Sequence, residues 1–262
     1  MKKFFLILFS VIIFFGVFYY FWLSPKYTVP ILAYHSINYG KGSHFVSPEN
    51  FAKQMEYIKK KSYEVITLDE LVRGIQGKKR FKRNKVVITF DDGYRDNFKY
   101  AYPVLKKMGF SAIIFLISDY VTDYKEDKER FLNWDEIKVM LKNNIFFGSH
   151  TKTHFYLGNV KDDKIIWDQV AGSKAAIEQK IGAPVEFFCY PTGGFNERVK
   201  EIVKGAGYKG ACTTNRGFAR FNSDVYELKR IKVTNSDIVK PFSFRLKLSG
   251  YYNIFRGRKD PY

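Results

Sequence analysis

The chain has 262 residues, of which 46% are apolar, and it carries a formal net charge of +18. This length and apolar content suffice for one large α/β domain or two small ones, and they exclude a globally disordered chain. A basic chain of this kind is a candidate for nucleic-acid binding. The N-terminal segment argues against nucleic acid as a partner.

The chain begins with an apolar run over residues 4–23, interrupted only by one serine and one glycine, after Lys2 and Lys3. About 20 helical residues span the roughly 30 Å hydrocarbon core of a bilayer, and lysines before such a run place the N-terminus in the cytoplasm. We predict that residues 1–24 are an uncleaved membrane anchor. The alternative is a cleaved signal peptide, although the run is longer than usual and no small-residue cleavage site follows. Either way the rest of the chain is extracellular, anchored in the first case and secreted in the second.

The remaining chain alternates short β-branched or aromatic runs with amphipathic stretches. Strands are predicted, in chain order, at residues 29–34, 63–66, 86–90, 112–117, 145–148, 186–190, 208–213 and 228–233. Helices are predicted between them at residues 48–61, 68–75, 97–108, 134–142, 161–181 and 196–204. This alternation predicts an α/β fold with a parallel sheet, either open or closed into a barrel.

Reactive side chains occur where predicted strands finish. His35 ends the first strand, Asp91 and Asp92 follow the third, His150 follows the fifth, and Pro191 follows the sixth. The carboxyl ends of the strands of a β/α barrel converge on one face. We therefore expect a single site assembled from separate strands.

One set of these residues suits a metal ion. His150 and His154 are separated by three residues, so both imidazoles can meet one ion from a single turn, and Asp92 would complete a two-histidine, one-carboxylate set. Three protein ligands leave positions open for water and substrate, as a catalytic metal requires. The alternative is two unrelated surface histidines, which is less expected in a chain with only 4 histidines.

A second set suits proton transfer. If Asp92 binds the metal, Asp91 is free to accept a proton from the attacking water, and His35 can donate one to a departing amine or alcohol. The alternatives are that the two aspartates cap the following helix and that His35 is a loop histidine held by the backbone. His44 lies in a Gly-rich loop and is expected at most beside the substrate. Backbone N–H groups of residues 191–194 could face an oxyanion.

The segments Thr-Phe-Asp-Asp-Gly at residues 89–93 and Ser-His-Thr-Lys-Thr-His at residues 149–154 resemble the first two motifs of a known family. It comprises the polysaccharide deacetylases with a NodB homology domain, carbohydrate esterase family 4. The resemblance covers roughly residues 29–235. It implies a distorted (β/α) barrel with about seven parallel strands. The implied chemistry is metal-dependent, usually zinc-dependent, removal of acetyl groups from N-acetylated or sometimes O-acetylated sugars.

Carried over by position, the resemblance makes Asp91 the base. It makes the metal ligands Asp92, His150 and His154. It makes the Thr192 N–H an oxyanion donor, with Tyr190 and Pro191 as neighbouring oxyanion or substrate residues.

The sequence departs from the family pattern in two places. The third motif usually begins with an arginine that orients the base, but residues 188–191 contain none, and Arg230 from a late strand is our candidate replacement. The usual acid histidine lies late in the domain, but no histidine follows His154. The branch that acts on poly-N-acetylglucosamine carries it on the first strand, and residues 30–36 resemble that arrangement. The resemblance therefore makes His35 the acid and favours this branch.

These observations predict a metal-dependent hydrolase that removes N-acetyl groups from a cell-surface polysaccharide containing N-acetylglucosamine, such as poly-N-acetylglucosamine or peptidoglycan. The alternatives are a catalytically impaired wall-glycan binding protein and an O-acetyl esterase on the same scaffold. The predicted domains are the anchor at residues 1–24, the deacetylase domain at 29–240, and a basic, aromatic tail at 241–262.

Two further expectations concern charge and cysteine. The basic residues 78–85 precede the central strand, so they should lie on the opposite face of the barrel from the site, toward anionic lipid. Cys189 and Cys212 fall in predicted strand interiors, where we expect unpaired packing residues, with a disulfide as the alternative in an oxidising compartment.

Overall fold

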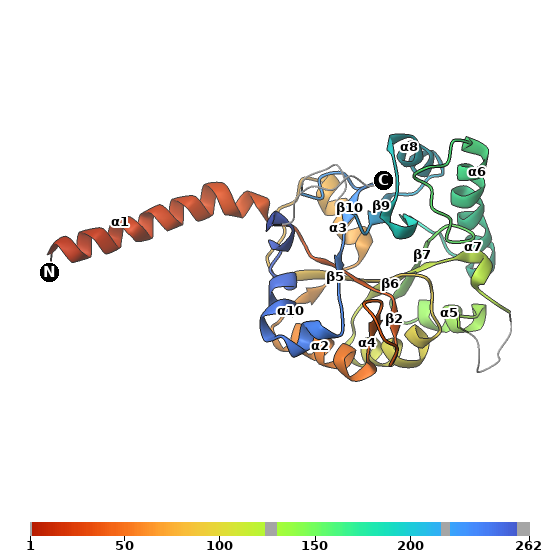
Figure 1. The fold of residues 1–262 in the computed structure, drawn as a ribbon, viewed down its shortest axis with the longest axis horizontal. Coiled ribbons are helices and arrows are strands. Elements are labelled where there is room, and N and C mark those ends of the chain that lie inside the picture. The colour runs from red at the N-terminus through yellow and green to blue at the C-terminus, as the bar shows by residue number, and fades with distance from the viewer. Residues whose placement is uncertain (1, 124–129, 216–220, 256–262) are drawn as a thin grey trace.

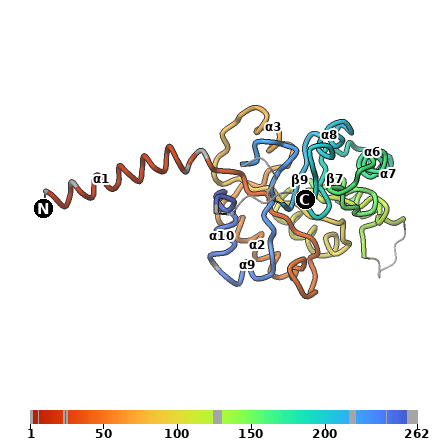
Figure 2. The backbone as a smooth tube through the Cα atoms, turned by 45° about the horizontal axis from the view of Figure 1, so that its top comes forward, coloured from red at the N-terminus to blue at the C-terminus, as the bar shows by residue number. Residues whose placement is uncertain are grey.

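The computed structural model describes residues 2–123, 130–215 and 221–255 (Figure 1). The N-terminal helix α1 (Lys2–Phe18) continues through the short helical segments η1 (Tyr19–Leu23) and η2 (Ser24–Lys26). It projects from the rest of the chain as one rod (Figures 1 and 2). Residues Lys3–Trp22 are long and apolar enough to cross a membrane. The prediction of one apolar N-terminal helix is confirmed.

The domain is built on eight strands in one path, whose neighbours all pair in parallel. In spatial order they are β10 (Leu228–Lys229), β9 (Gly210–Thr213), β8 (Phe187–Cys189), β7 (Ile145–Ser149), β6 (Ala112–Leu116), β5 (Lys85–Phe90), β1 (Ile31–Tyr34) and β11 (Ile231–Lys232). Off this path, β4 (Glu64–Val65) pairs with the start of β5, and β2 (Ser36–Ile37) pairs with β3 (Phe45–Val46). The predicted parallel α/β fold is confirmed, with eight strands in the path instead of about seven.

The two ends of the strand path meet at Arg230. Strand β10 pairs with β9 and strand β11 pairs with β1, yet only Arg230 separates β10 from β11 in the chain. The Arg230 N–H still donates to the Thr213 carbonyl (3.2 Å), whereas the Val233 N–H donates to the Ala33 carbonyl (3.0 Å). One extended segment thus switches partners at Arg230 and nearly closes the barrel. The switch places the Arg230 side chain inside it.

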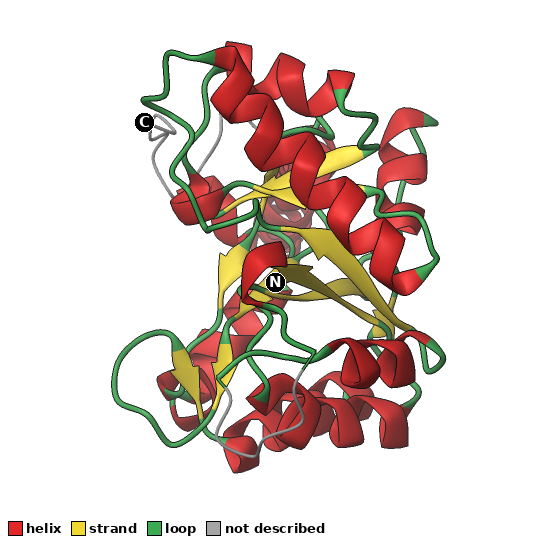
Figure 3. Ribbon diagram, turned by 90° about the vertical axis from the view of Figure 1, so that its right-hand side faces the viewer, coloured by secondary structure: helices red, strands yellow, loops and turns green. Residues whose placement is uncertain are grey.

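Helices cover the outside of the strands (Figure 3). They are α2 (Pro48–Lys60), α3 (Leu68–Gln76), α4 (Tyr102–Met108), α5 (Trp134–Leu141), α6 (Asp163–Trp167), α7 (Ser173–Ile181), α8 (Glu197–Gly205), α9 (Ser236–Val239) and α10 (Pro241–Leu248). π-Helical segments precede α4 as η3 (Asn97–Ala101) and join α6 to α7 as η5 (Asp168–Gly172). Short 3₁₀ turns complete the list as η4 (Ser118–Tyr120), η6 (Pro191–Gly193) and η7 (Tyr252–Phe255).

Alternation along β5 decides which side chains enter the barrel. Val86, Ile88 and Phe90 belong to the apolar cluster between strands and helices, whereas Val87 belongs to a second cluster on the other face of the strands, inside the barrel. Because strand side chains alternate with a period of two, Thr89 and Asp91 share the inward face of Val87. The barrel interior therefore carries apolar residues at its base and a carboxylate at its carboxyl end.

The segment after the last strand packs on the domain. Helix α10 lies beside α2 (Figures 1 and 2), and its residues Phe244 and Leu248 are fully buried. The Phe244 ring meets Tyr57 at a centroid distance of 5.8 Å. Residues 241–248 of the predicted tail are thus docked on α2, while residues 256–262 lie outside the described residues. The limits of the predicted domains stay predictions.

This packing predicts a contrast within one helix. Replacing Phe244 by Ala should lower the free energy of unfolding by about 3–5 kcal/mol, because it empties a buried aromatic site. Replacing Phe242, which is 75% exposed on the same helix, should change it by about 0.5 kcal/mol or less. Urea unfolding of the full chain in detergent measures both. Equal effects of the two substitutions would show that α10 is not docked.

Candidate active site

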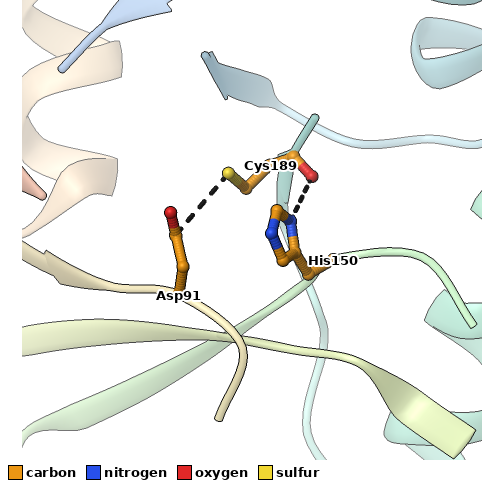
Figure 4. A group of neighbouring side chains, drawn as sticks. All are labelled: Asp91, His150 and Cys189. Atoms are coloured by element: carbon orange, nitrogen blue, oxygen red, sulfur yellow. Dashed lines mark hydrogen bonds between the residues drawn. The ribbon is translucent and has the colours of Figure 1, made fainter. Parts of the chain in front are cut away.

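The predicted site residues come together at the carboxyl ends of the strands. Asp91 and Asp92 follow β5, His150 follows β7, and the turn η6 follows β8. Figure 4 shows Asp91, His150 and Cys189 directed toward one another from three separate strands. The strand order places β5, β6, β7 and β8 side by side. Residues far apart in sequence therefore meet at the carboxyl end of the barrel, which we call its mouth.

Asp92, His150 and His154 form a candidate metal site. Both histidine Nε2 atoms lie 3.5 Å from Asp92 Oδ1. That oxygen is buried and has no hydrogen-bond partner among the described residues. Two ligands held about 2.1 Å from one tetrahedral ion are separated by about 3.4 Å. The spacing and the orphaned oxygen therefore fit a cation between the three side chains.

The His150 ring is held with one nitrogen toward this site. Its Nδ1 lies 2.7 Å from the Cys189 carbonyl oxygen, so the Nδ1–H donates to the backbone and Nε2 keeps its lone pair toward Asp92. Burial lowers the pKa of His150, although the carboxylates of Asp91 and Asp92 oppose this. A neutral imidazole is the form that ligates a metal.

Left-handed backbone conformations concentrate at this mouth. Asp92 has φ 70°, Thr151 66°, His154 60° and Thr192 53°. Such conformations cost of order 1–3 kcal/mol for a residue other than glycine, and they cluster at functional sites. In a regular strand the carboxylates of Asp91 and Asp92 would point to opposite faces. The left-handed turn at Asp92 brings both to the same mouth.

Asp91 is held by Arg230. The guanidinium makes a bidentate pair in which Nη1 lies 2.6 Å from Oδ1 and Nη2 lies 2.6 Å from Oδ2. Burial alone raises the pKa of Asp91, but the Arg230 charge and hydrogen bonds outweigh it and lower the pKa overall. The carboxylate is therefore ionised. Arg230, our candidate replacement for the missing third-motif arginine, thus contacts the predicted base.

His35 lies on the other side of Asp91. Its Nε2 is 3.7 Å from Asp91 Oδ2, and its side chain is 14% exposed. The His35 carbonyl accepts from Asn97 Nδ2 (2.8 Å), which fixes the backbone beside the mouth. Burial lowers the pKa of His35, although the carboxylates of Asp91 and Asp92 oppose this. The exposed His44 ring packs against His35 at a centroid distance of 4.9 Å.

Backbone hydrogen bonds within the turn η6 hold its conformation. The Gly193 N–H donates to the Tyr190 carbonyl (2.9 Å) and the Gly194 N–H to the Pro191 carbonyl (3.1 Å). Thr192, by contrast, is exposed at the tip of the turn. The Thr192 N–H is therefore the donor of this turn that we consider for an oxyanion.

Tyr190 and Pro191 are both buried. The Tyr190 hydroxyl donates to the Tyr226 carbonyl (3.1 Å), and its ring stacks on Phe195 at a centroid distance of 4.5 Å. The Tyr190 side chain is thus part of the core. A contact between Tyr190 and a substrate would have to come from its backbone.

Two residues that sequence reasoning did not assign to the site complete the Arg230 environment. Thr89 Oγ1 lies 3.0 Å from Arg230 Nη1, and Cys189 Sγ lies 3.0 Å from Nη2. The period-two pattern of β5 and β8 is the signal that could have found them, because it turns both side chains toward Asp91. Cys189 is the register partner of Cys212, and both are free thiols. Burial raises the pKa of both thiols, that of Cys212 to about 12.

Asp91, His150 and Cys189 are a second group of potential ligands that lie close together (Figure 4). Both Asp91 oxygens are already bound by Arg230. The guanidinium also lies against the Cys189 sulfur and would repel a cation there. The protonated thiol is a poor ligand. The Asp92 group therefore fits a metal better.

Comparison with known proteins agrees with this arrangement. The polysaccharide deacetylase family model matches residues 78–211. The Bacillus subtilis protein YxkH, whose name places it among these deacetylases, is 31% identical over 206 residues, which cover 79% of this chain and 71% of that protein. The chain belongs to the polysaccharide deacetylase family.

Two further proteins resemble this deacetylase. The poly-β-1,6-N-acetyl-D-glucosamine N-deacetylase of Staphylococcus aureus is 25% identical over 198 residues, covering 72% of this chain and 68% of that protein. The structure of the Streptococcus pyogenes deacetylase PplD in complex with acetate superposes with a TM-score of 0.72 at 25% identity, covering 80% of this chain and 93% of that chain.

Proposed function

We propose that this deacetylase hydrolyses N-acetyl groups of a cell-surface polysaccharide containing N-acetylglucosamine. The observation that carries the proposal is the orphaned Asp92 oxygen between two histidine Nε2 atoms, beside the ionised Asp91. We assign Asp92, His150 and His154 as ligands of a divalent cation. Two imidazoles and one carboxylate suit zinc.

Different residues of the chain then carry out different steps of the hydrolysis. When bound, the cation supplies Lewis acidity toward the acetyl carbonyl and the attacking water. Asp91, oriented by Arg230, accepts a proton as the water oxygen bonds to the carbonyl carbon. The Thr192 N–H donates to the developing oxyanion.

The second half of the reaction needs an acid. As the carbon–nitrogen bond breaks, His35 protonates the departing amine, and the products are acetate and a free amine on the polymer. Burial lowers the pKa of His35, so its imidazolium is a stronger acid and a smaller fraction of His35 is protonated near neutral pH. The product gains positive charge, which would alter adhesion or resistance to lysozyme.

The Arg230–Asp91 pair also favours hydrolysis over the alternative of a binding protein. That alternative depended on the arginine missing from the third motif, and Arg230 supplies a guanidinium to the same carboxylate. Acetate release from poly-N-acetylglucosamine and from peptidoglycan, measured side by side with and without chelator, tests the proposal. We expect chelator-sensitive release that is faster from poly-N-acetylglucosamine. Release from peptidoglycan alone would make peptidoglycan the substrate within this class, and release only from O-acetylated sugar would refute the proposed substrate.

The ligand assignment predicts a contrast between two histidines. His154→Ala should weaken metal binding by about tenfold or more, because even changes around a ligand shell cost that much. His44→Ala is the matched control, since His44 is an exposed histidine outside the ligand group. Metal content after dialysis against a graded chelator measures both. Equal retention by the two variants would remove His154 from the ligand set.

We further propose that α1 anchors the enzyme with its catalytic domain outside the cell. The apolar segment Lys3–Trp22 supports this. The basic connection before β5 supports the orientation, because it lies at the amino ends of the strands, opposite the proposed site. The basic face would then meet the membrane, and the site would face the wall polymer.

A further inference from the structure

A pocket lies where the N-terminal helix meets the domain. It has a volume of about 650 Å³. Its walls come from the end of the helix, the entry to β1, helix α3, the basic connection before β5, and residues 221–223. Because the chain enters β1 and β5 here, the pocket opens at the amino ends of the strands. It is therefore separate from the candidate active site.

The pocket is cationic. Lys78, Lys79, Arg80 and Arg83 line it, and no carboxylate is among its described lining residues. In the part of the chain that the structure describes, none of the four has an ion-pair partner. Lys85, which follows directly, is instead buried and paired with Glu64. Four exposed positive charges therefore line one pocket, and no carboxylate of the described residues neutralises them.

Contacts hold this basic connection against the helix. Arg80 donates to the Ser24 side chain, and the Arg83 guanidinium lies over the Tyr19 ring, 4.4 Å from its centroid. Phe81 packs directly over Gly74 of α3, where an added Cβ would lie 2.1 Å from the ring. Arg80 and Arg83 are therefore held at the end of the apolar helix.

The walls also carry aromatic residues. Tyr20, Phe21, Tyr27 and Phe81 line the same hollow as the four cations. Tyrosine and tryptophan near the end of a spanning helix lie at the level of lipid headgroups, and Lys or Arg there attract anionic lipid. A pocket lined by both cations and aromatic rings matches a phosphate joined to acyl chains.

We propose that this pocket binds the phosphate headgroup of an anionic phospholipid in the leaflet where α1 ends. Binding would fix the amino face of the barrel on the membrane and direct the catalytic mouth away from it. The proposal rests on the proposed membrane anchor and is independent of the hydrolytic activity.

Native mass spectrometry of the full chain in nonionic detergent tests this, with phosphatidylglycerol as the probe. We expect one phosphatidylglycerol to bind per chain, at least about tenfold more tightly than phosphatidylcholine. The triple substitution Lys78→Gln, Lys79→Gln and Arg83→Gln should weaken this binding by about tenfold or more. It keeps the hydrogen bond from Arg80 to Ser24 and removes the contact of Arg83 with the Tyr19 ring. Because all three residues are exposed, unfolding midpoints should stay unchanged and exclude misfolding.

Matched controls separate this pocket from general charge attraction. Lys53→Gln, Lys161→Gln and Lys164→Gln remove the same charge from exposed positions near the starts of α2 and α6, and should leave lipid binding unchanged. Equal loss in both triple variants, or equal affinity for phosphatidylcholine, would overturn the proposal. Competition by inorganic phosphate at the same concentration would identify a free-phosphate site instead. Incorporation into phosphatidylcholine nanodiscs tests the anchor by itself.

Discussion

Replacing Asp91 by Asn should lower the rate of acetate release by about 10²- to 10⁴-fold, the usual contribution of a general base. Bound metal should be retained, because the candidate ligands are Asp92, His150 and His154. The amide cannot accept the proton that the ionised carboxylate takes from water. Acetate assays on metal-loaded protein, together with metal content, measure the two effects.

The control for this variant must address stability, because Asp91→Asn would leave the buried Arg230 charge without a partner. Glu136→Gln is the matched substitution, since Glu136 pairs with Arg95 (2.7 Å) and both side chains are only 9% exposed. It should destabilise the chain while leaving acetate release intact at temperatures below unfolding. Turnover by Asp91→Asn at the wild-type rate would remove Asp91 as the base.

Replacing Arg230 by Met should lower the free energy of unfolding by about 3–5 kcal/mol, because the Asp91 carboxylate stays buried without its counter-ion. The Arg230 side chain is 0% exposed and that of Asp91 is 2% exposed, so water cannot compensate. We expect kcat to fall and KM to change little, since Arg230 acts on substrate only through the orientation of Asp91. Urea unfolding and steady-state kinetics check the two parts.

A double-mutant cycle separates structure from catalysis in this pair. Asp91→Asn with Arg230→Met removes both charges, so stability should recover toward that of the wild type. Acetate release should not recover. Arg230→Lys should rescue kcat in part, because an ammonium keeps the charge but cannot form the bidentate pair. Recovery of turnover in the double variant would mean that the single variants lost only their fold.

The sequence was enough to expect several candidate site residues at one end of the barrel, because they directly follow predicted strands. Asp91 and Asp92 follow a β-branched run, and His150 and His154 follow another predicted strand, so parallel-strand geometry was enough to bring them to one edge. Arg230 could be named only as a candidate, because its place depends on a strand that changes partners between β9 and β1. That switch is a tertiary property, and two-residue strands on each side give little local signal.

Other features depended on packing that no local pattern encodes. The left-handed turn at Asp92 is not expected from its residue type alone, yet it allows adjacent carboxylates to share a mouth. Phe244 and Phe242 look alike in sequence, but only the first is buried. From the sequence, Cys189 was expected to be an ordinary small core residue. The contact of its sulfur with Arg230 could not be predicted.

Anomalous scattering from crystals of the zinc-loaded chain tests the central claim most directly. We expect one peak within bonding distance of Asp92 Oδ1 and of Nε2 of both His150 and His154. A peak bonded to Asp91 and Cys189, or one remote from all three assigned ligands, would contradict it.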